Sequence, residues 1–381
     1  MAQVRIFFAT NRKFRKRADG VRFEAEINKP IDCEFRVGRA DIELDGQPGN
    51  RSYALIAGSV HIYPERRMRS DADCEAIVKR DDLPAEIAFP KAREQALEAA
   101  ETRERLGSSE MFAEIQTDMR AQACDALLYI HGFNNSFADA IEAAAELADR
   151  YRGEGVELLV VLFSWPSEGK LLPPNRYFSD RTAAELSGMA IGRALARLRD
   201  LLRDFARLGQ PCQQRLHLMA HSMGNYALRF AVRALVWQHA AGGLLPVFEH
   251  AFLMAADADD DALEIDDALP KLQALARIAQ NIHVYHSKGD RALWASDWTK
   301  GNPDRLGARG PRNIERVDER VTAIDCRKVD ETEGDSGNHN YFRRRPEVIA
   351  DVAAVLRGLG PEEIENRRAL APRRFRLDRK D

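Results

Sequence analysis

Apolar residues along the middle of the chain form short continuous runs, and each run is followed by a longer stretch with helical spacing. Buried strands without a polar face are typical of parallel sheets that helices cover on both sides. The pattern therefore predicts an α/β fold with a mostly parallel central sheet and helices on both faces. The predicted strands cover residues 4–9, 126–130, 158–163, 216–219, 251–255, 282–285 and 321–324.

Helical spacing fills most of the chain between these strands. Ser136 and Asp139 form a capping-box pattern at the start of one such stretch. One or two amphipathic helices are expected between residues 90 and 119. Further helices are predicted over residues 137–153, 183–208, 223–241 and 346–359.

The two ends of the chain do not show this alternation of apolar strands and helices. Residues 21–63 contain short fragments broken by glycines, which predict antiparallel strands. We expect one domain over residues 1–360, in which residues 1–90 form a strand-rich extension of the sheet. The basic run at residues 11–17 is expected to be a solvated loop, and residues 361–381 a basic, flexible tail.

Composition narrows the class of protein. Hydrophobic residues make up 45% and charged residues 31% of the 381 residues, and the net charge is −3. No global positive field points to nucleic acid. Five scattered cysteines predict neither a disulfide framework nor a metal site. No stretch has the length of a membrane span or the form of a signal peptide, so we expect a cytoplasmic protein. We also expect no cofactor.

The stretch around Ser222 carries the strongest chemical signal. An apolar strand ends in Ala220 and His221, Ser222 follows, and a helical pattern begins at Met223. A serine in a sharp strand-to-helix turn is exposed above the carboxyl end of the strand, as a nucleophile needs. The flanking positions must be small. Ala220 and Gly224 satisfy this requirement, although the usual pattern has glycine at the first position.

A serine hydroxyl needs a base, and the base needs a carboxylate. Of the nine histidines, only His339 follows the last predicted strand. His217 and His283 lie within apolar strands and are expected in the core. His221 and His131 flank turns, where structural hydrogen bonds are the expected role.

Two strand ends offer the acid. Asp290 follows Gly289 after the strand at 282–285, and Asp257 or Asp259 follows the strand at 251–255. We select Asp290. The acidic run at 257–261 is expected to be a solvated loop or a helix cap, not a metal site.

The developing oxyanion needs two backbone N–H donors. The amide of Met223 lies directly after the serine at a helix N-terminus, and the amide of Phe133 lies in the turn after the strand at 126–130. Gly132 allows a close approach of the backbone at this turn.

A set of motifs follows in order along the chain: Phe7-Phe8-Ala9-Thr10-Asn11-Arg12, Ile130-His131-Gly132-Phe133-Asn134, Phe163-Ser164-Trp165-Pro166-Ser167, Ala220-His221-Ser222-Met223-Gly224-Asn225, Ser287-Lys288-Gly289-Asp290 with Ala292-Leu293, and His339-x-Tyr341-Phe342. Together these motifs resemble the α/β-hydrolase superfamily, and within it a largely uncharacterised bacterial branch of esterase-like serine hydrolases. The resemblance spans residues 4–357 and implies the triad Ser222, Asp290 and His339.

The motifs allow several substrate classes. Carboxylic esters are the first choice because they need the least help for the leaving group. Amides, peptides and thioesters use the same residues, and a non-catalytic binding protein of the same fold is the rival from another class. We expect a small acyl substrate as partner and leave the oligomeric state open. The expected pocket residues are Asn134, Trp165, Tyr177 and Trp294.

Overall fold

The computed structural model describes most of the chain. The described residues are 2–17, 20–27, 35–47, 50–63, 107–167, 175–207, 213–238, 244, 246–265, 271–293, 304–329 and 338–379. Of the sequence predictions, Trp294 and the part of the predicted 90–119 helical segment before residue 107 lie outside these residues.

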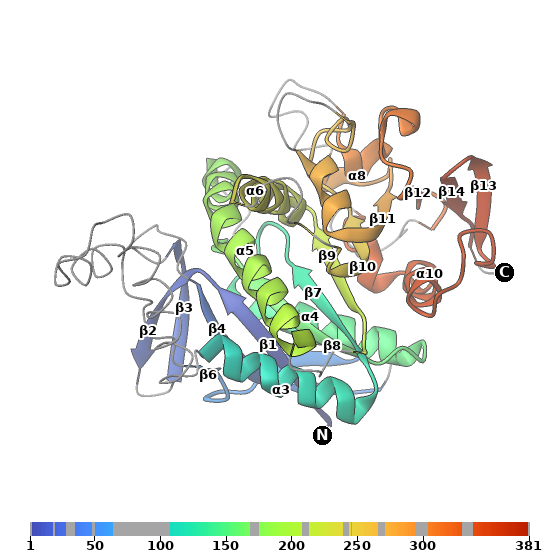
Figure 1. Cartoon of the computed structure of the whole chain (residues 1–381). Helices are drawn as coiled ribbons and strands as arrows, with labels where there is room; N and C mark the ends of the chain where they lie inside the picture. The colour runs from blue at the N-terminus through green and yellow to red at the C-terminus, as the bar shows by residue number, and fades with distance from the viewer. Residues whose placement is uncertain are drawn as a thin grey trace, which may run out of the picture.

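A twisted sheet runs through the middle of the molecule (Figure 1). Its described strands number 12. From one edge to the other the order is β13 (Arg367–Ala371), β14 (Arg374–Leu377), β12 (Val321–Asp325), β11 (Ala279–His286), β10 (Phe248–Met254), β9 (Leu216–His221), β7 (Asp125–Ile130), β8 (Leu158–Ser164), β1 (Ala2–Thr10), β4 (Arg36–Asp45) and β5 (Ser52–Leu55), with β6 (His61–Ile62) also paired to β4.

The sheet is parallel from β1 to β14 and antiparallel at both edges. Neighbouring strands from β1 through β8, β7, β9, β10, β11 and β12 to β14 pair in parallel. The N-terminal strands β4, β5 and β6 pair antiparallel, and so does β13 with β14. The prediction of a mostly parallel sheet with an antiparallel N-terminal portion is confirmed.

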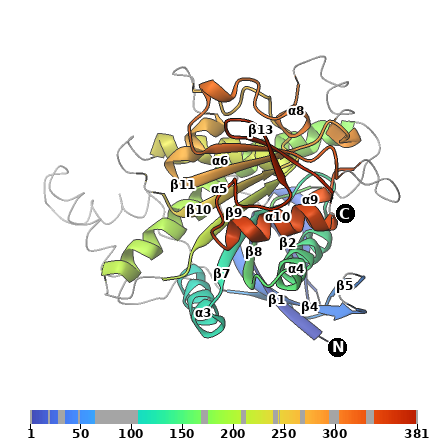
Figure 2. The same ribbon diagram turned by 90° about the vertical axis from the view of Figure 1, so that its right-hand side faces the viewer.

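Helices cover both faces of the sheet (Figure 2). One face packs against α3 (Gly107–Gln122), α5 (Asn175–Arg207) and α6 (Met223–Gln238). The other packs against α4 (Phe137–Gly153), α9 (Tyr341–Arg344) and α10 (Pro346–Leu356). Short turns of helix follow β10 and β11: η1 (Leu272–Arg277), α8 (Leu306–Arg309) and η2 (Ile314–Arg316).

Side chains along each strand point alternately to the two faces of the sheet and so pack into both cores. In β1, Phe7 packs under α3, α5 and α6, whereas Phe8 packs on the opposite face under α4. In β9, Leu218 and Met219 divide in the same way. Because successive side chains point to opposite faces, a continuous apolar strand contributes to both cores. The predicted capping box is present, since Ser136 and Asp139 each accept a backbone hydrogen bond from the other.

The basic run near the N-terminus differs from the sequence prediction. Residues Arg12–Arg17 form β2, which pairs antiparallel with β3 (Gly20–Ile27), and not a solvated loop. Arg12, the first residue of β2, is only 1% exposed. A solvated loop was expected because charge runs usually face water, but Arg12 finds polar partners in the interior.

The described part of the C-terminal tail, up to residue 379, contains strands β13 and β14, whereas a flexible segment is predicted over 361–381. Phe375 and Leu377 of β14 are buried, and β14 extends the sheet beside β12 (Figure 1). The Arg367 guanidinium pairs with the Asp351 carboxylate of α10 at 2.7 Å, and these side chains are 1% and 0% exposed. Tyr285 of β11 donates a hydrogen bond to the same carboxylate. A buried carboxylate needs a cation, and the tail supplies it.

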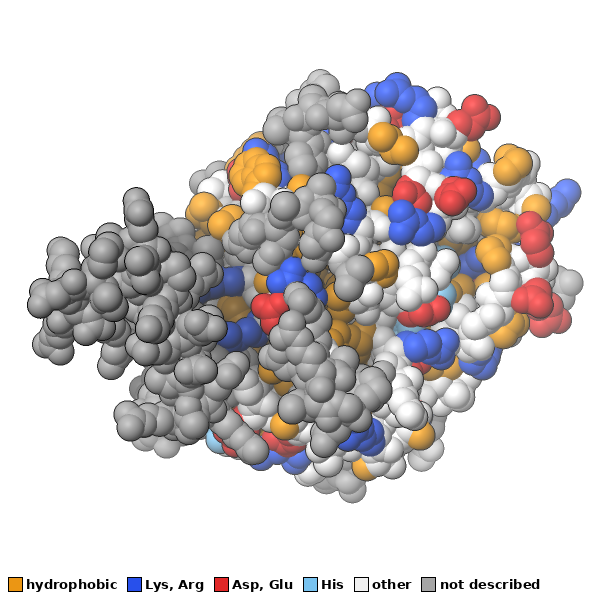
Figure 3. Space-filling model, viewed as in Figure 1, with side chains coloured by type: hydrophobic (Ala, Val, Ile, Leu, Met, Phe, Trp, Pro, Cys, Tyr) orange, Lys and Arg blue, Asp and Glu red, His pale blue; other side chains and the backbone are white. Residues whose placement is uncertain are grey.

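The surface carries charges of both signs. On the face shown in Figure 3, the described Lys and Arg side chains alternate with Asp and Glu side chains and do not gather in one broad patch. Among the described residues, no helix is long and apolar enough to cross a membrane.

Histidines occupy buried positions in the sheet, as predicted for His217 and His283. The His250 Nδ1 lies 3.1 Å from the His283 Nε2 on the neighbouring strand, and the His217 and His250 rings stack at 5.4 Å between centroids. Burial lowers the pKa of His250 to about 3 and that of His286 to about 4. These rings are therefore neutral in the folded protein at neutral pH.

We expect replacement of Arg367 by Met to destabilise the protein by about 3–5 kcal/mol, because it leaves the buried Asp351 carboxylate without its cation. Urea denaturation measures the change in free energy of unfolding. Arg368→Met, at the exposed next position of the same strand, is the control and should lie within about 0.5 kcal/mol of wild type. Equal effects of the two substitutions would mean that the ion pair does not anchor the tail.

The buried histidines predict a loss of stability in mild acid. In the unfolded chain a histidine binds its proton near pH 6.5, whereas the folded protein resists protonation of His250 and His286 until about pH 3 and 4. The free energy of unfolding should therefore be highest above pH 6.5 and fall by about 1.4 kcal/mol per pH unit for each such histidine as the pH drops below it. Urea denaturation from pH 8 to pH 5 measures this slope. His250→Gln should make it shallower, and a flat profile in the wild type would contradict the prediction.

Candidate functional site

Ser222 lies in the sharp turn between β9 and α6, at the carboxyl edge of the sheet. Its backbone φ is +52°, a left-handed value that is uncommon for a residue with a side chain. The turn is held by hydrogen bonds from both sides. The Ser222 N–H donates to the Met254 carbonyl at 2.9 Å, and the Asp257 N–H donates to the Ser222 carbonyl at 3.1 Å. Backbone strain of this kind persists only where the surroundings impose it.

Small residues allow the turn to pack closely against the neighbouring strands. A Cβ at Gly224 would lie 2.6 Å from the carbonyl oxygens of both Ile130 and His131. Ala220 is fully buried between Ile130 of β7 and Leu253 of β10, its register partners. A methyl group therefore fits at position 220, whereas position 224 admits only glycine.

Asn225 holds the turn from below, in the first turn of α6. Its side-chain amide donates to the carbonyls of Ala220 at 2.8 Å and of Ser222 and Met254 at 3.3 Å. The residue is fully buried. The sequence places Asn225 within the motif around Ser222 but predicts no role for it. A lone polar residue on the apolar face of the helix is the signal that identifies it.

His339 and Asp290 form a close pair. The His339 Nδ1 lies 2.6 Å from the Asp290 Oδ2, and the Asp290 side chain is fully buried. The second carboxylate oxygen accepts the backbone N–H groups of Ala292 and Leu293, each at 3.1 Å. The carboxylate is therefore fixed by its own turn, and it orients the imidazole with Nδ1 as the donor.

The loop that carries His339 is tied to the serine turn. His221, directly before Ser222, lies with its Nε2 3.1 Å from the His339 carbonyl. Burial lowers the pKa of His221 well below its ordinary value, so the ring is neutral and Nε2 donates its single proton to this carbonyl. Tyr341 bonds the carbonyl of Tyr285 at 2.9 Å and accepts the Ala255 N–H at 3.1 Å. These contacts bring residues 222, 290 and 339 to one edge of the sheet.

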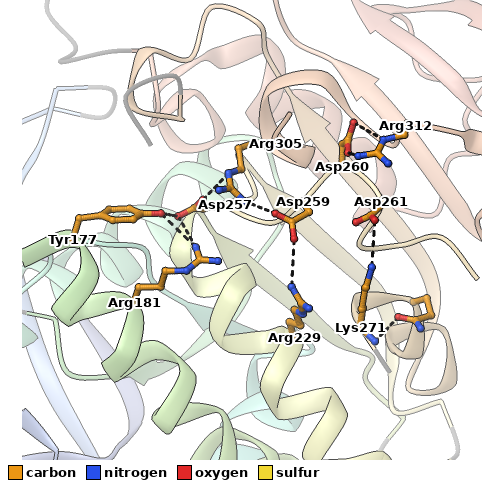
Figure 4. A network of polar contacts seen from close by, with 11 residues as sticks. Tyr177, Arg181, Arg229, Asp257, Asp259, Asp260, Asp261, Lys271, Arg305 and Arg312 are labelled. Atoms are coloured by element: carbon orange, nitrogen blue, oxygen red, sulfur yellow. Dashed lines mark hydrogen bonds and ion pairs between the residues drawn. The ribbon is translucent and has the colours of Figure 1, made fainter. Parts of the chain in front are cut away.

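The rival acids have other partners (Figure 4). The buried Asp257 carboxylate accepts a hydrogen bond from the Tyr177 hydroxyl and lies 3.5 Å from the Arg305 guanidinium. Asp259 pairs with Arg305 and, at 3.6 Å, with Arg229.

The remaining carboxylates of the acidic run also face cations. Asp260 pairs with Arg312, and Asp261 pairs with Lys271. The run is thus an ion-pair network and not the solvated loop expected. In the described part of the chain, no group of three or more His, Cys, Asp or Glu side chains is placed to hold a metal ion.

The turn after β7 lies against the serine. A Cβ at Gly132 would lie 2.9 Å from the Ser222 Cβ and 2.8 Å from the His221 Nδ1. Asn134 has a left-handed φ of +63°, and its buried Oδ1 accepts no hydrogen bond from any residue in the described part of the chain. The half-buried Phe133 ring contacts the Tyr177 ring at 5.7 Å between centroids.

Trp165 supports this turn from the core. It is fully buried, stacks on His131 at 5.1 Å between ring centroids, and donates from Nε1 to the His131 carbonyl at 2.7 Å. Burial lowers the pKa of His131 to about 3, so this imidazole is neutral.

Replacing Gly132 by Ala should slow the reaction of Ser222 with a fluorophosphonate reagent by about 100-fold, because the added methyl displaces the serine or the turn. Gly153→Ala is the control, since a Cβ there meets nothing within 4 Å. The measurement is the labelling rate of the folded protein, with circular dichroism to verify the fold. An unchanged rate in the Gly132 variant would show that the close approach has no consequence for the serine.

A family model described as an alpha/beta hydrolase of unknown function (DUF900) matches residues 108–357, more than half of the chain. No curated protein matches the sequence.

Three solved structures illustrate the distance to characterised proteins. An alpha/beta-superfamily hydrolase from Xanthomonas campestris is 15% identical, with 62% of this chain and 99% of that chain covered and a TM-score of 0.26. An esterase from Pyrobaculum calidifontis is 12% identical, with 61% and 76% covered and a TM-score of 0.28. A Trichoderma reesei cutinase is 11% identical, with 70% and 98% covered and a TM-score of 0.26.

The sequence identities and TM-scores of these three structures are low. The assignment of the chain to a family rests on the family model, and the mostly parallel sheet agrees with it. The chain belongs to the DUF900 family of alpha/beta hydrolases.

Proposed function

We propose that the protein is a serine hydrolase that cleaves carboxylic esters through an acyl-enzyme on Ser222, with His339 as base and Asp290 as acid. The observation that carries the proposal is the 2.6 Å contact between His339 and Asp290, on a loop tied through His221 to the left-handed turn at Ser222. A strained serine, an oriented imidazole and a buried carboxylate are the parts that nucleophilic acyl transfer requires.

In the proposed cycle, the Ser222 Oγ attacks the ester carbonyl and His339 takes the hydroxyl proton on Nε2. The His339 imidazolium forms in this step, and Asp290 stabilises it by accepting a hydrogen bond from Nδ1. The tetrahedral oxyanion receives hydrogen bonds from the N–H groups of Met223 and Phe133. Met223 is the first residue of α6, so the positive end of the helix dipole adds to its donor.

His339 then returns the proton to the leaving oxygen, and the alcohol departs. A water molecule, deprotonated by His339, attacks the acyl-enzyme. The carboxylic acid leaves and Ser222 regains its proton, so the cycle consumes one ester and one water and needs no cofactor. Esters are favoured over amides because an alkoxide is the better leaving group.

The proposed pocket lies around the turn after β7. Asn134 supports this location because its Oδ1 accepts no hydrogen bond from the described residues and can accept a donor from the substrate. Tyr177 borders Phe133 and is held by Asp257. Trp165 contributes by supporting the turn from the core, and Trp294 stays a prediction.

Amides, peptides and thioesters remain alternative substrates of the same residues, and a non-catalytic binding protein remains the rival class. Labelling by a fluorophosphonate reagent separates the classes, because only an activated serine reacts at an appreciable rate. A series of p-nitrophenyl esters of increasing acyl length, compared with matched anilides and thioesters, then identifies the acyl chemistry.

Substitution of the two candidate acids tests the triad. We expect Asp290→Asn to lower kcat by about 10⁴-fold, because the amide no longer holds the imidazole in the required tautomer. Asp257→Asn, its isosteric control at the neighbouring strand end, should lower kcat by less than about tenfold, since its carboxylate contacts Tyr177, Arg181 and Arg305 and not His339 in the contacts described.

Hydrolysis of p-nitrophenyl butyrate measures both variants, beside Ser222→Ala and His339→Ala, which should be inactive. If Asp257→Asn abolishes hydrolysis and Asp290→Asn retains it, Asp257 and not Asp290 is the acid of the triad. If Ser222→Ala retains activity, the proposal as a whole is wrong.

A further inference from the structure

Arg12 is a buried cation whose role no part of the reaction described above explains. It lies at the junction of β1 and β2 and is 1% exposed. Burial lowers the pKa of its guanidinium to about 9, so the group is still charged at neutral pH. Burying a charge is costly unless polar partners compensate it. The contacts of the buried guanidinium therefore indicate its role.

The guanidinium joins the two loops that follow β7 and β8. Its Nη2 donates to the Asn135 carbonyl at 2.8 Å, in the loop after β7. Its Nε donates to the Ser164 Oγ at 2.9 Å, and its Nη1 donates to the Ser167 carbonyl at 3.1 Å, at the end of β8 and in the loop that follows. The fixed fork of a guanidinium sets the distance between the two loops, which a single ammonium cannot do.

A second contact ties the same loops to α5. The Asn135 N–H donates to the Ser167 Oγ at 3.3 Å, and this hydroxyl donates to the buried Asp180 carboxylate at 2.5 Å. The charge of Asp180 also opposes the lowering of the Arg12 pKa by burial, more strongly than that of Asp139 does. The loop after β7 is therefore held at Asn135 from two directions.

Asn135 passes this restraint to the proposed oxyanion donor. Its side-chain amide donates to the carbonyls of Gly132 at 3.1 Å and Phe133 at 2.8 Å. The Gly132 carbonyl and the Phe133 N–H belong to one planar trans peptide, so they point in opposite directions. The Asn135 amide, together with the His131 Nδ1 at 2.8 Å from the same oxygen, holds the Gly132 carbonyl and so fixes the direction in which the Phe133 N–H points. The Gly132 Cα of this peptide lies against Ser222.

We propose that Arg12 is a positioning residue that aims the Phe133 N–H at the oxyanion through Asn135. The N-terminal strand, which precedes the part of the chain matched by the family model, is thereby a working part of the active site. The inference rests on the proposed function, because it assigns a role in stabilising the tetrahedral intermediate.

The test compares Arg12→Lys with Arg5→Lys in the full-length protein. Arg5 is the matched control on β1, since its side chain is 44% exposed and pairs with Asp41 at the surface. With p-nitrophenyl butyrate, Arg12→Lys should lower kcat by about 100-fold and change KM by less than about threefold, as expected when an interaction made only in the transition state is lost. Arg5→Lys should leave both constants unchanged.

A second variant separates positioning from folding. Asn135→Ala removes the amide that holds Gly132 but leaves the buried cation and its other partners in place. It should lower kcat to a similar extent with little change in melting temperature, even if Arg12→Lys is unstable. The double variant should be no slower than the slower single variant, because both substitutions break the same chain of contacts.

Inhibitor affinity gives a readout that a purely structural role does not move. A trifluoromethyl ketone forms a tetrahedral adduct whose oxygen occupies the oxyanion position, so its affinity should fall in Asn135→Ala by the same factor as kcat/KM. The corresponding methyl ketone, a ground-state mimic, should bind as in wild type. Equal losses for the two ketones would overturn the inference in favour of a structural role.

The outcomes also separate this inference from the proposed function. If Ser222→Ala is inactive while Asn135→Ala and Arg12→Lys keep kcat within about threefold of wild type, the function stands and the inference fails. If the wild type hydrolyses none of the esters, the rate of fluorophosphonate labelling replaces kcat, because the phosphonyl oxygen also requires the oxyanion donors. Unchanged labelling of both variants would overturn the inference there too.

Discussion

The left-handed backbone at Ser222 is the constraint on which the rest of the site depends. A residue with a side chain adopts this conformation only when its surroundings prevent relaxation. Here the peptide groups around the turn bond to β10 and α6, and the Asn225 amide bonds three carbonyls at once. Such close backbone packing leaves no room for side chains at Gly132 and Gly224. The same contacts that strain the serine therefore set the positions of the loops around it.

Buried charges join segments that are far apart in the sequence. Arg12 connects the N-terminal strand to the loops after β7 and β8, and Arg305 bonds the carboxylates that follow β10. Arg367 connects the C-terminal hairpin to Asp351 on α10. In each case an ion removed from water is stable only while its partner stays in place. These pairs make the two ends of the chain integral to the α/β core.

Local pattern was sufficient for much of the fold and for part of the site. Strands of the parallel sheet were predicted because fully buried strands read as unbroken apolar runs. The turn at Ser222 could be identified because strand, small residue, serine and helix follow one another directly. α6 begins at the predicted residue, Met223, whereas α5 begins at Asn175, eight residues before the predicted start at 183, since helix ends depend on neighbours and not on periodicity alone.

Apolar runs and helical spacing alone predict the order of the core strands and helices between residues 126 and 356, and with it the edge of the sheet at which Ser222, Asp290 and His339 follow their elements. The tertiary structure decided what local pattern cannot contain. Asp257 and Asp290 both end apolar strands, yet packing gives one an arginine and a tyrosine, and the other His339. Arg12 and Arg367 stand in basic runs that resemble solvated segments, and they are buried because distant chain segments supply their partners. Burial and ion pairing depend on contacts between residues remote in sequence, and those contacts exist only once the chain has folded.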